Sequence, residues 1–327
     1  MKKQITKILT LALAILMVAL PLMSCRKPDK ELEMKIYLLN GTTALGASKL
    51  IIDSKNGNTE MNYKIETFAS ADAITGAIVS GECAIAALPT NAAANLYKKS
   101  EGKIQLLAIN TLGVLYLLSN GETITDFNSL KGKTIYLPGA GSNPEFITEA
   151  LLRANNLSES DVTLDTTSYP SPDALQAAIT AGEVKLAVLP EPKVTVVTSA
   201  NSSVKVALDF TAEWEKIYGK NTIAQGCLVV NTAFAAEHPN EVKQFLEDYK
   251  ASVEYIAAAS DDAINAVVEA GILPKAAIAK KALPNCNICF IEGRAMKKAI
   301  SVFYDKLYES NNKSIAAIPD DGFYYSK

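Results

Sequence analysis

Histidine is almost absent from this chain of 327 residues, and the single one, His238, stands directly before a proline in the segment AAEHPN. Hydrolases of the Ser/His and Cys/His types need an imidazole base beside the nucleophile, whereas this position is typical of a surface residue at a helix start. Carboxylate pairs add little, because Asp261-Asp262 suits a helix start and Asp320-Asp321 suits a polar turn. We therefore expect no enzyme, no catalytic residue and no cofactor.

An excess of basic residues is also missing. The chain has 32 lysines and arginines against 35 aspartates and glutamates, a formal net charge of -3, whereas nucleic-acid-binding domains carry a basic face. Nucleic acid is therefore excluded as the expected partner. Hydrophobic residues make up 49% of the sequence, and the stretch from residue 34 onward is long enough for two domains of about 100–200 residues each.

The apolar run at residues 8–23 is shorter than the about 20 residues that a membrane-spanning helix needs. Three lysines precede it, so residues 1–24 have the layout of a secretory signal peptide. Leu22-Met23-Ser24-Cys25 resembles the bacterial lipobox, which implies an exported protein anchored through lipidated Cys25 to the outer face of the cell membrane, or its periplasmic side. Residues 25–33 then form a charged tether. The alternative is an ordinary cleaved signal with an incidental cysteine.

Two further cysteines, Cys286 and Cys289, have the C-x-x-C spacing of redox and zinc sites. A tetrahedral zinc site takes four ligands, and the chain has no second C-x-x-C and only one histidine. If NICFI at residues 287–291 is a strand, the two sulfurs point to opposite faces. We expect structural thiols and no metal site, with a disulfide or a redox or metal role as alternatives.

An internal repeat predicts the architecture. The pattern G-E-x-x-[IL]-A-x-L-P occurs twice, 101 positions apart, and two upstream segments recur at nearly the same spacing. Each copy is predicted to be strand, helix, strand, helix, strand, with Ser70 and Ser171 as helix caps. The sequence therefore predicts an α/β fold of two similar Rossmann-like lobes with a ligand cleft between them. The recurring segments are 81–89 with 182–190, 68–74 with 169–175, and 36–38 with 135–137.

Two apolar runs are predicted to cross between the lobes and to form a hinge. Residues 105–118 are predicted as one long buried strand into lobe two, and residues 224–231 as the return crossing. Later helices, at 241–259, 261–270 and 293–309, are expected to complete lobe one. The predicted division is 34–116 for the first part of lobe one, 117–222 for lobe two and 223–327 for the completion of lobe one.

The loops after the parallel strands are the predicted ligand site, because open parallel sheets bind ligands beyond the carboxyl ends of their strands. The turns NGTT at 40–43 and PGAGSN at 138–143 present backbone N–H groups before a helix, which suit an anion or a carbonyl. The candidate ligand-binding residues are Gly41, Thr42, Thr43, Phe68, Ser70, Thr90, Asn91, Gly141, Ser142, Asn143, Tyr169 and Glu191.

These loops contain no arginine, lysine or histidine, and Glu191 is their only charged residue. A doubly charged anion would therefore depend on backbone dipoles alone, whereas a neutral heterocycle or an amine could use Glu191 and the ring of Phe68 or Tyr169. The alternatives are a solvated Glu191 in a Pro-x-Pro turn and aromatic rings that pack beneath their loops.

Four segments carry a resemblance to a known family. They are LPTNAAANLYKK, SLKGKTIYLPG, LPEPKV and QGCLVVNTAFAAEHPNEVKQFLEDYKAS. Together with the lipobox, they are similar to the substrate-binding lipoproteins of ABC importers, in the alkanesulfonate, nitrate and thiamine-precursor (SsuA/ThiY-like) branch of the type II periplasmic-binding-protein superfamily. The resemblance implies a monomer that binds a sulfonate, nitrate or thiamine-precursor-like molecule and delivers it to ABC permease and ATPase subunits. A sensory lipoprotein without transport, and an enzyme similar to a yeast pyrimidine synthase, are the alternatives.

Overall fold

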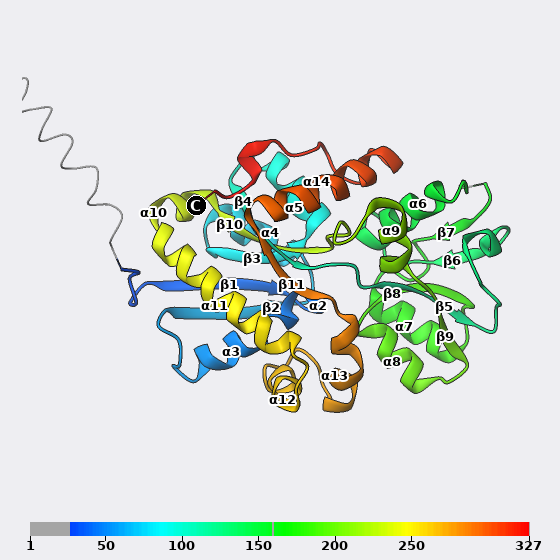
Figure 1. The fold of residues 1–327 in the computed structure, drawn as a ribbon, viewed down its shortest axis with the longest axis horizontal. Helices are drawn as coiled ribbons and strands as arrows, with labels where there is room; N and C mark the ends of the chain where they lie inside the picture. The colour runs from blue at the N-terminus through cyan, green and yellow to red at the C-terminus, as the bar shows by residue number, and fades with distance from the viewer. Residues whose placement is uncertain (1–26, 159, 327) are drawn as a thin grey trace, which may run out of the picture.

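The computed structural model describes residues 27–158 and 160–326, which form two lobes that lie side by side (Figure 1). The predicted signal peptide, the lipobox and Cys25 lie outside the described residues. Within the described chain, no helix combines the length and the apolar character of a membrane span.

Lobe one is built on a six-stranded sheet of order β11-β4-β10-β3-β1-β2. The strand β1 runs parallel to β2 and β3, while β10 is antiparallel to β3 and β4, and β11 is antiparallel to β4. The strands are β1 (Glu33–Leu39), β2 (Asn62–Phe68), β3 (Ile85–Pro89), β4 (Ile104–Thr111), β10 (Gly226–Asn231) and β11 (Ile288–Glu292). The helices are α2 (Thr42–Leu45), α3 (Ser48–Lys55), α4 (Asp72–Ser80), α5 (Thr90–Lys99), α10 (Thr232–Glu237), α11 (Pro239–Ala257), α12 (Asp261–Glu269), α13 (Ala276–Ala282) and α14 (Gly293–Ser310).

Lobe two is built on a five-stranded sheet of order β7-β6-β8-β5-β9, in which β6 is parallel to β7 and β8 and β5 is antiparallel to β8 and β9. Its strands are β5 (Leu115–Asn120), β6 (Thr134–Tyr136), β7 (Thr163–Asp165), β8 (Leu186–Pro190) and β9 (Val204–Asp209). Its helices are α6 (Asn143–Ala154), α7 (Pro172–Ala181), α8 (Lys193–Ala200) and α9 (Phe210–Tyr218).

The predicted α/β fold with two similar lobes is confirmed. In each lobe the first parallel strand lies between the second and the third, as β2-β1-β3 and as β7-β6-β8. Ser171 caps α7 as predicted, because its hydroxyl accepts a hydrogen bond from the Ala174 N–H at 3.2 Å. The prediction for Ser70 is wrong, since Ala71 is the N-cap of α4 and Ser70 stands one residue earlier, where it binds the Asp72 N–H.

The crossing into lobe two differs from the prediction. Residues 105–118 are not one strand but two, β4 and β5, separated by three residues around Gly113. A Cβ on Gly113 would lie 2.2 Å from Thr211 Oγ1 and 2.9 Å from Ile223 Cγ2. The strand is therefore interrupted at Gly113, where Thr211 of α9 and Ile223, just before the return crossing, leave no room for a side chain. The predicted return strand is confirmed as β10.

The two crossings are joined to each other by hydrogen bonds. The Gln225 N–H donates to the Thr111 carbonyl at 3.0 Å, and the Val114 N–H donates to Gln225 Oε1 at 2.6 Å. A third segment takes part, because the Leu112 N–H donates to the Asn287 carbonyl at 3.0 Å. The chain thus has a three-segment junction, and not two independent strands, between its sheets.

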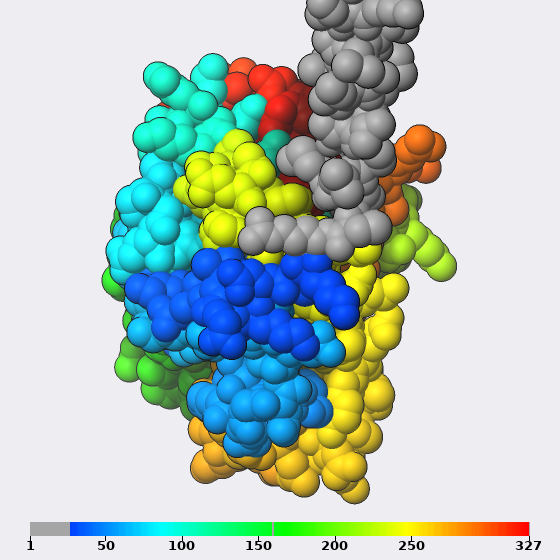
Figure 2. Space-filling model, turned by 90° about the vertical axis from the view of Figure 1, so that its left-hand side faces the viewer, coloured from blue at the N-terminus to red at the C-terminus, as the bar shows by residue number. Residues whose placement is uncertain are grey.

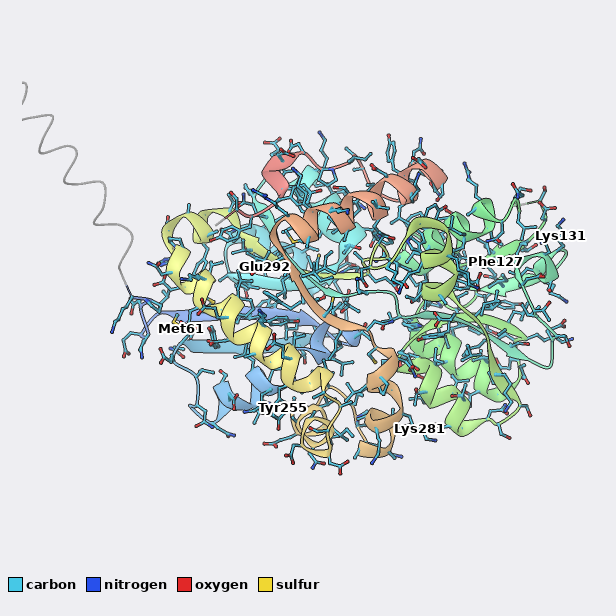
Figure 3. All side chains as sticks on the ribbon, in the orientation of Figure 1. Met61, Phe127, Lys131, Tyr255, Lys281 and Glu292 are labelled. Carbon is cyan, nitrogen blue, oxygen red and sulfur yellow. The ribbon has the colours of Figure 1, made fainter. Side chains whose placement is uncertain are left out.

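The three predicted C-terminal helices are confirmed as α11, α12 and α14, with ends within two residues of the expected ones. They do not stay on lobe one alone: the Phe303 ring of α14 lies 5.5 Å from the Trp214 ring of α9. On the opposite side of the junction, Lys281 of α13, labelled in Figure 3, reaches the Ser199 hydroxyl of α8 at 3.5 Å. Helices of lobe one therefore hold lobe two on both sides of the crossings.

The described N-terminal residues join lobe one at the end away from lobe two (Figure 1). Figure 2 views this end, where the start of β1 lies beside α11. The Asp29 N–H donates to the Glu241 carboxylate at 2.8 Å, and Glu241 is only 5% exposed. The segment before β1 is therefore attached to the body of lobe one from residue 29 onward.

Cys286 and Cys289 are free thiols in different surroundings. The predicted strand is present as β11, but Cys286 precedes it and packs among α12 and α13, while Cys289 packs against the main core. Burial raises the pKa of the Cys289 thiol to about 12 and that of the Cys286 thiol well above its usual value. Thiols of this kind are protonated and inert at neutral pH.

Candidate functional site at the lobe interface

The carboxyl ends of the third parallel strands lie at the junction between the lobes. Pro89, at the end of β3, pairs with Gly226 of the return crossing, and Pro190, at the end of β8, pairs with Leu115 of the outward crossing. The repeat thus places the loop after each third strand against a crossing segment. Helices α5 and α8 begin in these loops, so their N-terminal ends lie close to the junction.

Four of the predicted ligand-binding residues meet directly across the interface. The Asn91 side chain donates to the Gly141 carbonyl at 3.3 Å, and Asn143 Nδ2 donates to Thr90 Oγ1 at 3.5 Å. Asn143 Nδ2 also donates to the Gln225 carbonyl at 3.1 Å. The start of α5 in lobe one and the start of α6 in lobe two therefore form one polar contact.

The hydrogen-bond network fixes the orientation of the Asn143 amide. The Thr90 hydroxyl donates its hydrogen to the Ala224 carbonyl at 2.6 Å, so it can only accept from Asn143. The Gln225 carbonyl is likewise an acceptor, which places Nδ2 on this side and Oδ1 on the other. Asn143 is 5% exposed, and its Oδ1 has no hydrogen-bond partner among the described residues.

Polar side chains, all but one of them uncharged, are buried around this interface. Burial of a polar group is unfavourable unless it is hydrogen-bonded, and most of these residues have partners, so Asn143 Oδ1, unpaired within the described chain, makes the cluster a candidate functional site. No lysine, arginine or histidine is among the buried polar residues of the described chain. The buried polar residues around the junction are Thr43, Thr90, Asn91, Asn110, Thr111, Asn143, Glu191, Thr195 and Gln225.

Glu191 is buried at 3% exposure, which excludes the solvated alternative. Its carboxylate accepts hydrogen bonds from the Thr195 N–H at 3.1 Å and from the Thr195 hydroxyl at 2.9 Å, in the first turn of α8. Burial raises the pKa of this carboxyl, and the hydrogen bonds from Thr195 oppose that effect. The carboxylate therefore already serves to start α8, on the lobe-two side of the junction.

The remaining predicted residues lie within their own lobes. The Phe68 ring packs on Tyr37 at 4.7 Å between centroids, and the Tyr169 ring packs on Tyr136 at 5.5 Å. Because Tyr37 and Tyr136 are equivalent in the repeat, both contacts agree with the alternative in which these rings pack beneath their loops. Ser70 is exposed, and Gly41, Thr42 and Ser142 are only partly covered.

Thr43 lies closer to the junction. Its carbonyl accepts from Asn110 Nδ2 at 3.0 Å, and a Cβ on Gly226 would meet its methyl group at 2.7 Å.

Sequence reasoning missed the two amides that organise the site, Asn110 and Gln225. The backbone and side chain of Gln225 bind Thr90, Thr111, Val114 and Asn143. Both amides stand inside the apolar runs that were predicted as crossings, QLLAINT and AQGCLVV. A polar amide within a buried run was the available signal, because such a group needs partners there.

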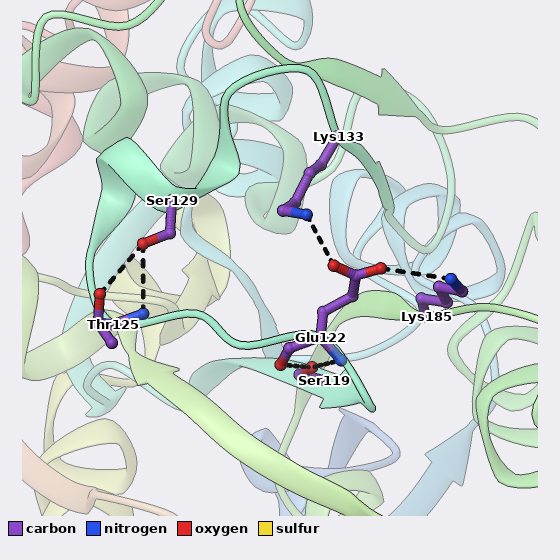
Figure 4. A network of polar contacts seen from close by, with 6 residues as sticks. All are labelled: Ser119, Glu122, Thr125, Ser129, Lys133 and Lys185. Carbon is purple, nitrogen blue, oxygen red and sulfur yellow. Dashed lines mark hydrogen bonds and ion pairs between the residues drawn. The ribbon is translucent and has the colours of Figure 1, made fainter.

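Two charged or ionisable groups have their partners within a single lobe. Glu122 of lobe two binds Lys133 at 2.7 Å and Lys185 at 3.4 Å at the edge of the second sheet (Figure 4). The hydrogen bonds from Lys133 and Lys185 hold the pKa of the Glu122 carboxyl below its usual value. The half-buried His238 ring packs on Phe234 between α10 and α11 of lobe one.

Comparison with known proteins identifies this architecture. Residues 103–263 match the family described as NMT1/THI5 like. The match covers just under half of the chain. It runs from the outward crossing through lobe two to α12, so it includes most of the interface described above. A search of curated proteins found no match.

Solved structures show that about nine-tenths of the chain has the periplasmic-binding-protein fold. An ABC transporter protein from Parabacteroides distasonis is 23% identical, with a TM-score of 0.75, over 91% of this chain and 100% of that one. The periplasmic aliphatic sulphonate binding protein SsuA from Escherichia coli is 13% identical, with a TM-score of 0.70, over 90% and 92%. The alkanesulfonate-binding protein SsuA from Xanthomonas axonopodis pv. citri, bound to MOPS, is 14% identical, with a TM-score of 0.64, over 90% and 96%.

Proposed function

We propose that this protein is an extracytoplasmic solute-binding lipoprotein that captures a small molecule between its two lobes and delivers it to an ABC importer. One observation carries the proposal: the starts of α5 and α6, from different lobes, meet at a buried polar interface in which Asn143 Oδ1 has no partner within the described chain. The family match and the periplasmic-binding-protein fold support it. The permease and ATPase subunits of the importer are the proposed partners.

Capture would depend on the junction. A ligand shifts an equilibrium between open and closed forms only by its differential affinity for the two. A molecule that binds Asn143 and the start of α5 together would make its full set of contacts only when the lobes are in contact. The hydrogen bonds of Gln225 with Val114 and Thr111 would keep the two crossing segments together while the lobes open and close.

Thermal unfolding against a ligand panel tests this proposal. The purified mature chain would be heated with alkanesulfonates, nitrate, thiamine precursors, nucleobases, amides, amines and amino acids. A ligand at a hundred times its dissociation constant stabilises the folded state by about 2.7 kcal/mol, which is expected to raise the melting temperature by several degrees. Stabilisation by one class and not by the others would support solute capture, and an unchanged melting temperature across the panel would contradict it.

The proposed membrane anchor has a separate test. Cys25→Ala should move the protein from the membrane fraction to the soluble extracytoplasmic fraction, because the anchor depends on acyl chains attached to that sulfur. Fractionation of cells that express the variant or the natural sequence measures this directly. Retention of the alanine variant in the membrane fraction would show that the lipobox interpretation is wrong, without affecting the proposal for the lobes.

A further inference from the structure

The first turn of α6 already contains an anion supplied by the protein. The helix has twelve residues, and its N-cap, Ser142, makes no capping hydrogen bond with its side chain. Instead, the backbone N–H of Gly141 donates to the carboxylate of Glu145, four residues later. A carboxylate at this position interacts favourably with the helix dipole and with the free N–H groups. Glu145 thus places a negative charge beside Gly141, one residue before the N-cap, near the helix start at which an anion would otherwise be favoured.

Cationic side chains that could offset this charge are missing from the strand-end loops and from the buried part of the described chain. The loops after the parallel strands contain no lysine, arginine or histidine, and the buried polar residues of the described chain include none. An anionic ligand beside Gly141 would compete with Glu145 for the N–H and would be repelled by its charge.

The unpaired carbonyl oxygen of Asn143, at the same helix start, indicates which kind of ligand group would bind instead of an anion. Asn143 Oδ1 is buried, has no partner among the described residues, and cannot exchange places with Nδ2 without losing two hydrogen bonds. A carbonyl oxygen can only accept. The group that completes this site must therefore donate a hydrogen bond.

We propose that Glu145 is a specificity-determining residue that excludes anions from the start of α6, and that the site accepts a neutral or cationic molecule which donates an N–H or O–H to Asn143 Oδ1. This inference rests on the proposed function, since it assigns the chemical class of the captured solute. It separates this chain from the sulphonate binding proteins that share its fold.

Calorimetric titration of the natural chain and four variants tests the assignment. The probes are anions (alkanesulfonates, nitrate, inorganic phosphate) and uncharged or cationic donors (primary amides, alkylamines, amino-substituted heterocycles). The natural chain should bind a donor and no anion. Glu145→Gln keeps a similar shape without the charge, so it should bind anions at least about tenfold more tightly than the natural chain does. Its affinity for the donor should change by less than about threefold.

Two further variants serve as controls. Glu145→Asp keeps the negative charge, so it should bind anions no better than the natural chain. Glu213→Gln removes one negative charge from α9 of the same lobe, where the carboxylate pairs with Lys216 at the surface. It should behave as the natural chain does toward both classes of probe.

The results separate this inference from the proposed function. If the natural chain binds an anion in preference to donors, or if Glu145→Gln gains no anion affinity while a donor still binds, the inference is overturned and solute capture stands. If no probe of either class binds any of the proteins, both are overturned.

Asn143→Ala should lower the affinity for the donor by at least about fivefold without creating anion binding. An unchanged donor affinity would show that Asn143 does not contact the ligand.

Discussion

Replacing Gly113 with alanine is expected to lower the free energy of unfolding by about 3 kcal/mol, at the upper end of the range for an overpacked core position. The added methyl carbon would lie 2.2 Å from Thr211 Oγ1, 2.9 Å from Ile223 Cγ2 and 3.0 Å from Thr211 Cβ. These neighbours come from α9 and from the return crossing, so relief requires the junction itself to shift. Urea unfolding measures the change as a lower midpoint at constant slope.

Gly76→Ala is the matched control for this substitution. Gly76 lies inside α4, and a Cβ there would meet nothing within 4 Å. Alanine is favoured over glycine in a helix interior by about 0.5–1 kcal/mol, so this variant should be more stable than the natural chain. Equal stability of the two alanine variants would show that the junction accommodates the added methyl group despite the short distances at Gly113.

Trp214→Ala is expected to cost about 3–5 kcal/mol, the range for removal of a buried tryptophan. Trp214 is fully buried, and its indole N–H donates to Thr222 Oγ1 at 3.0 Å. Its ring lies 4.6 Å from Tyr218 in lobe two and 5.5 Å from Phe303 of α14. The substitution therefore removes part of the lobe-two core and the contact through which α14 holds that lobe. Loss of a single cooperative transition in thermal unfolding, together with the lower stability, would report the weakened contact.

Ile217→Ala controls for the change in α9 itself. Ile217 lies three residues further along the same helix and is 43% exposed. Its truncation removes a half-exposed side chain and should cost less than about 1 kcal/mol. If both variants lose the same stability, the loss in Trp214→Ala does not come from the contact of Trp214 with α14, because Ile217 does not make that contact.

The internal repeat, and not any single motif, predicted the two similar α/β lobes. Each copy places a strand, a helix and a strand in a fixed order, and local patterns of this kind depend on residues close in sequence. The same patterns located the strand ends, and four of the residues proposed there, Thr90, Asn91, Gly141 and Asn143, meet at the interface. Periodicity could not show the break at Gly113, because it depends on Thr211 and Ile223, which are distant in sequence.

In the candidate site, too, some features follow from the local sequence and others only from contacts between distant residues. Glu191 was identified by its charge, but the hydrogen bonds that commit its carboxylate to Thr195 arise only when α8 forms next to the junction. Glu145 and Gln225 were not identified, since one stands in a helix and the other in an apolar run, and neither position is unusual in isolation. Their importance follows from which backbone groups they reach in the folded chain.

The sequence by itself determined two α/β lobes, the helices that follow them, the strand-end loops and the absence of cationic side chains from those loops. These properties follow from composition and from short-range patterns that occur in both copies of the repeat. Only the tertiary structure decided that three segments meet at the junction, that α14 binds both lobes, that Glu145 occupies the start of α6 and that Asn143 keeps a free acceptor. Such features depend on hydrogen bonds and close contacts between distant residues, because a buried polar group takes whichever partner the fold brings to it.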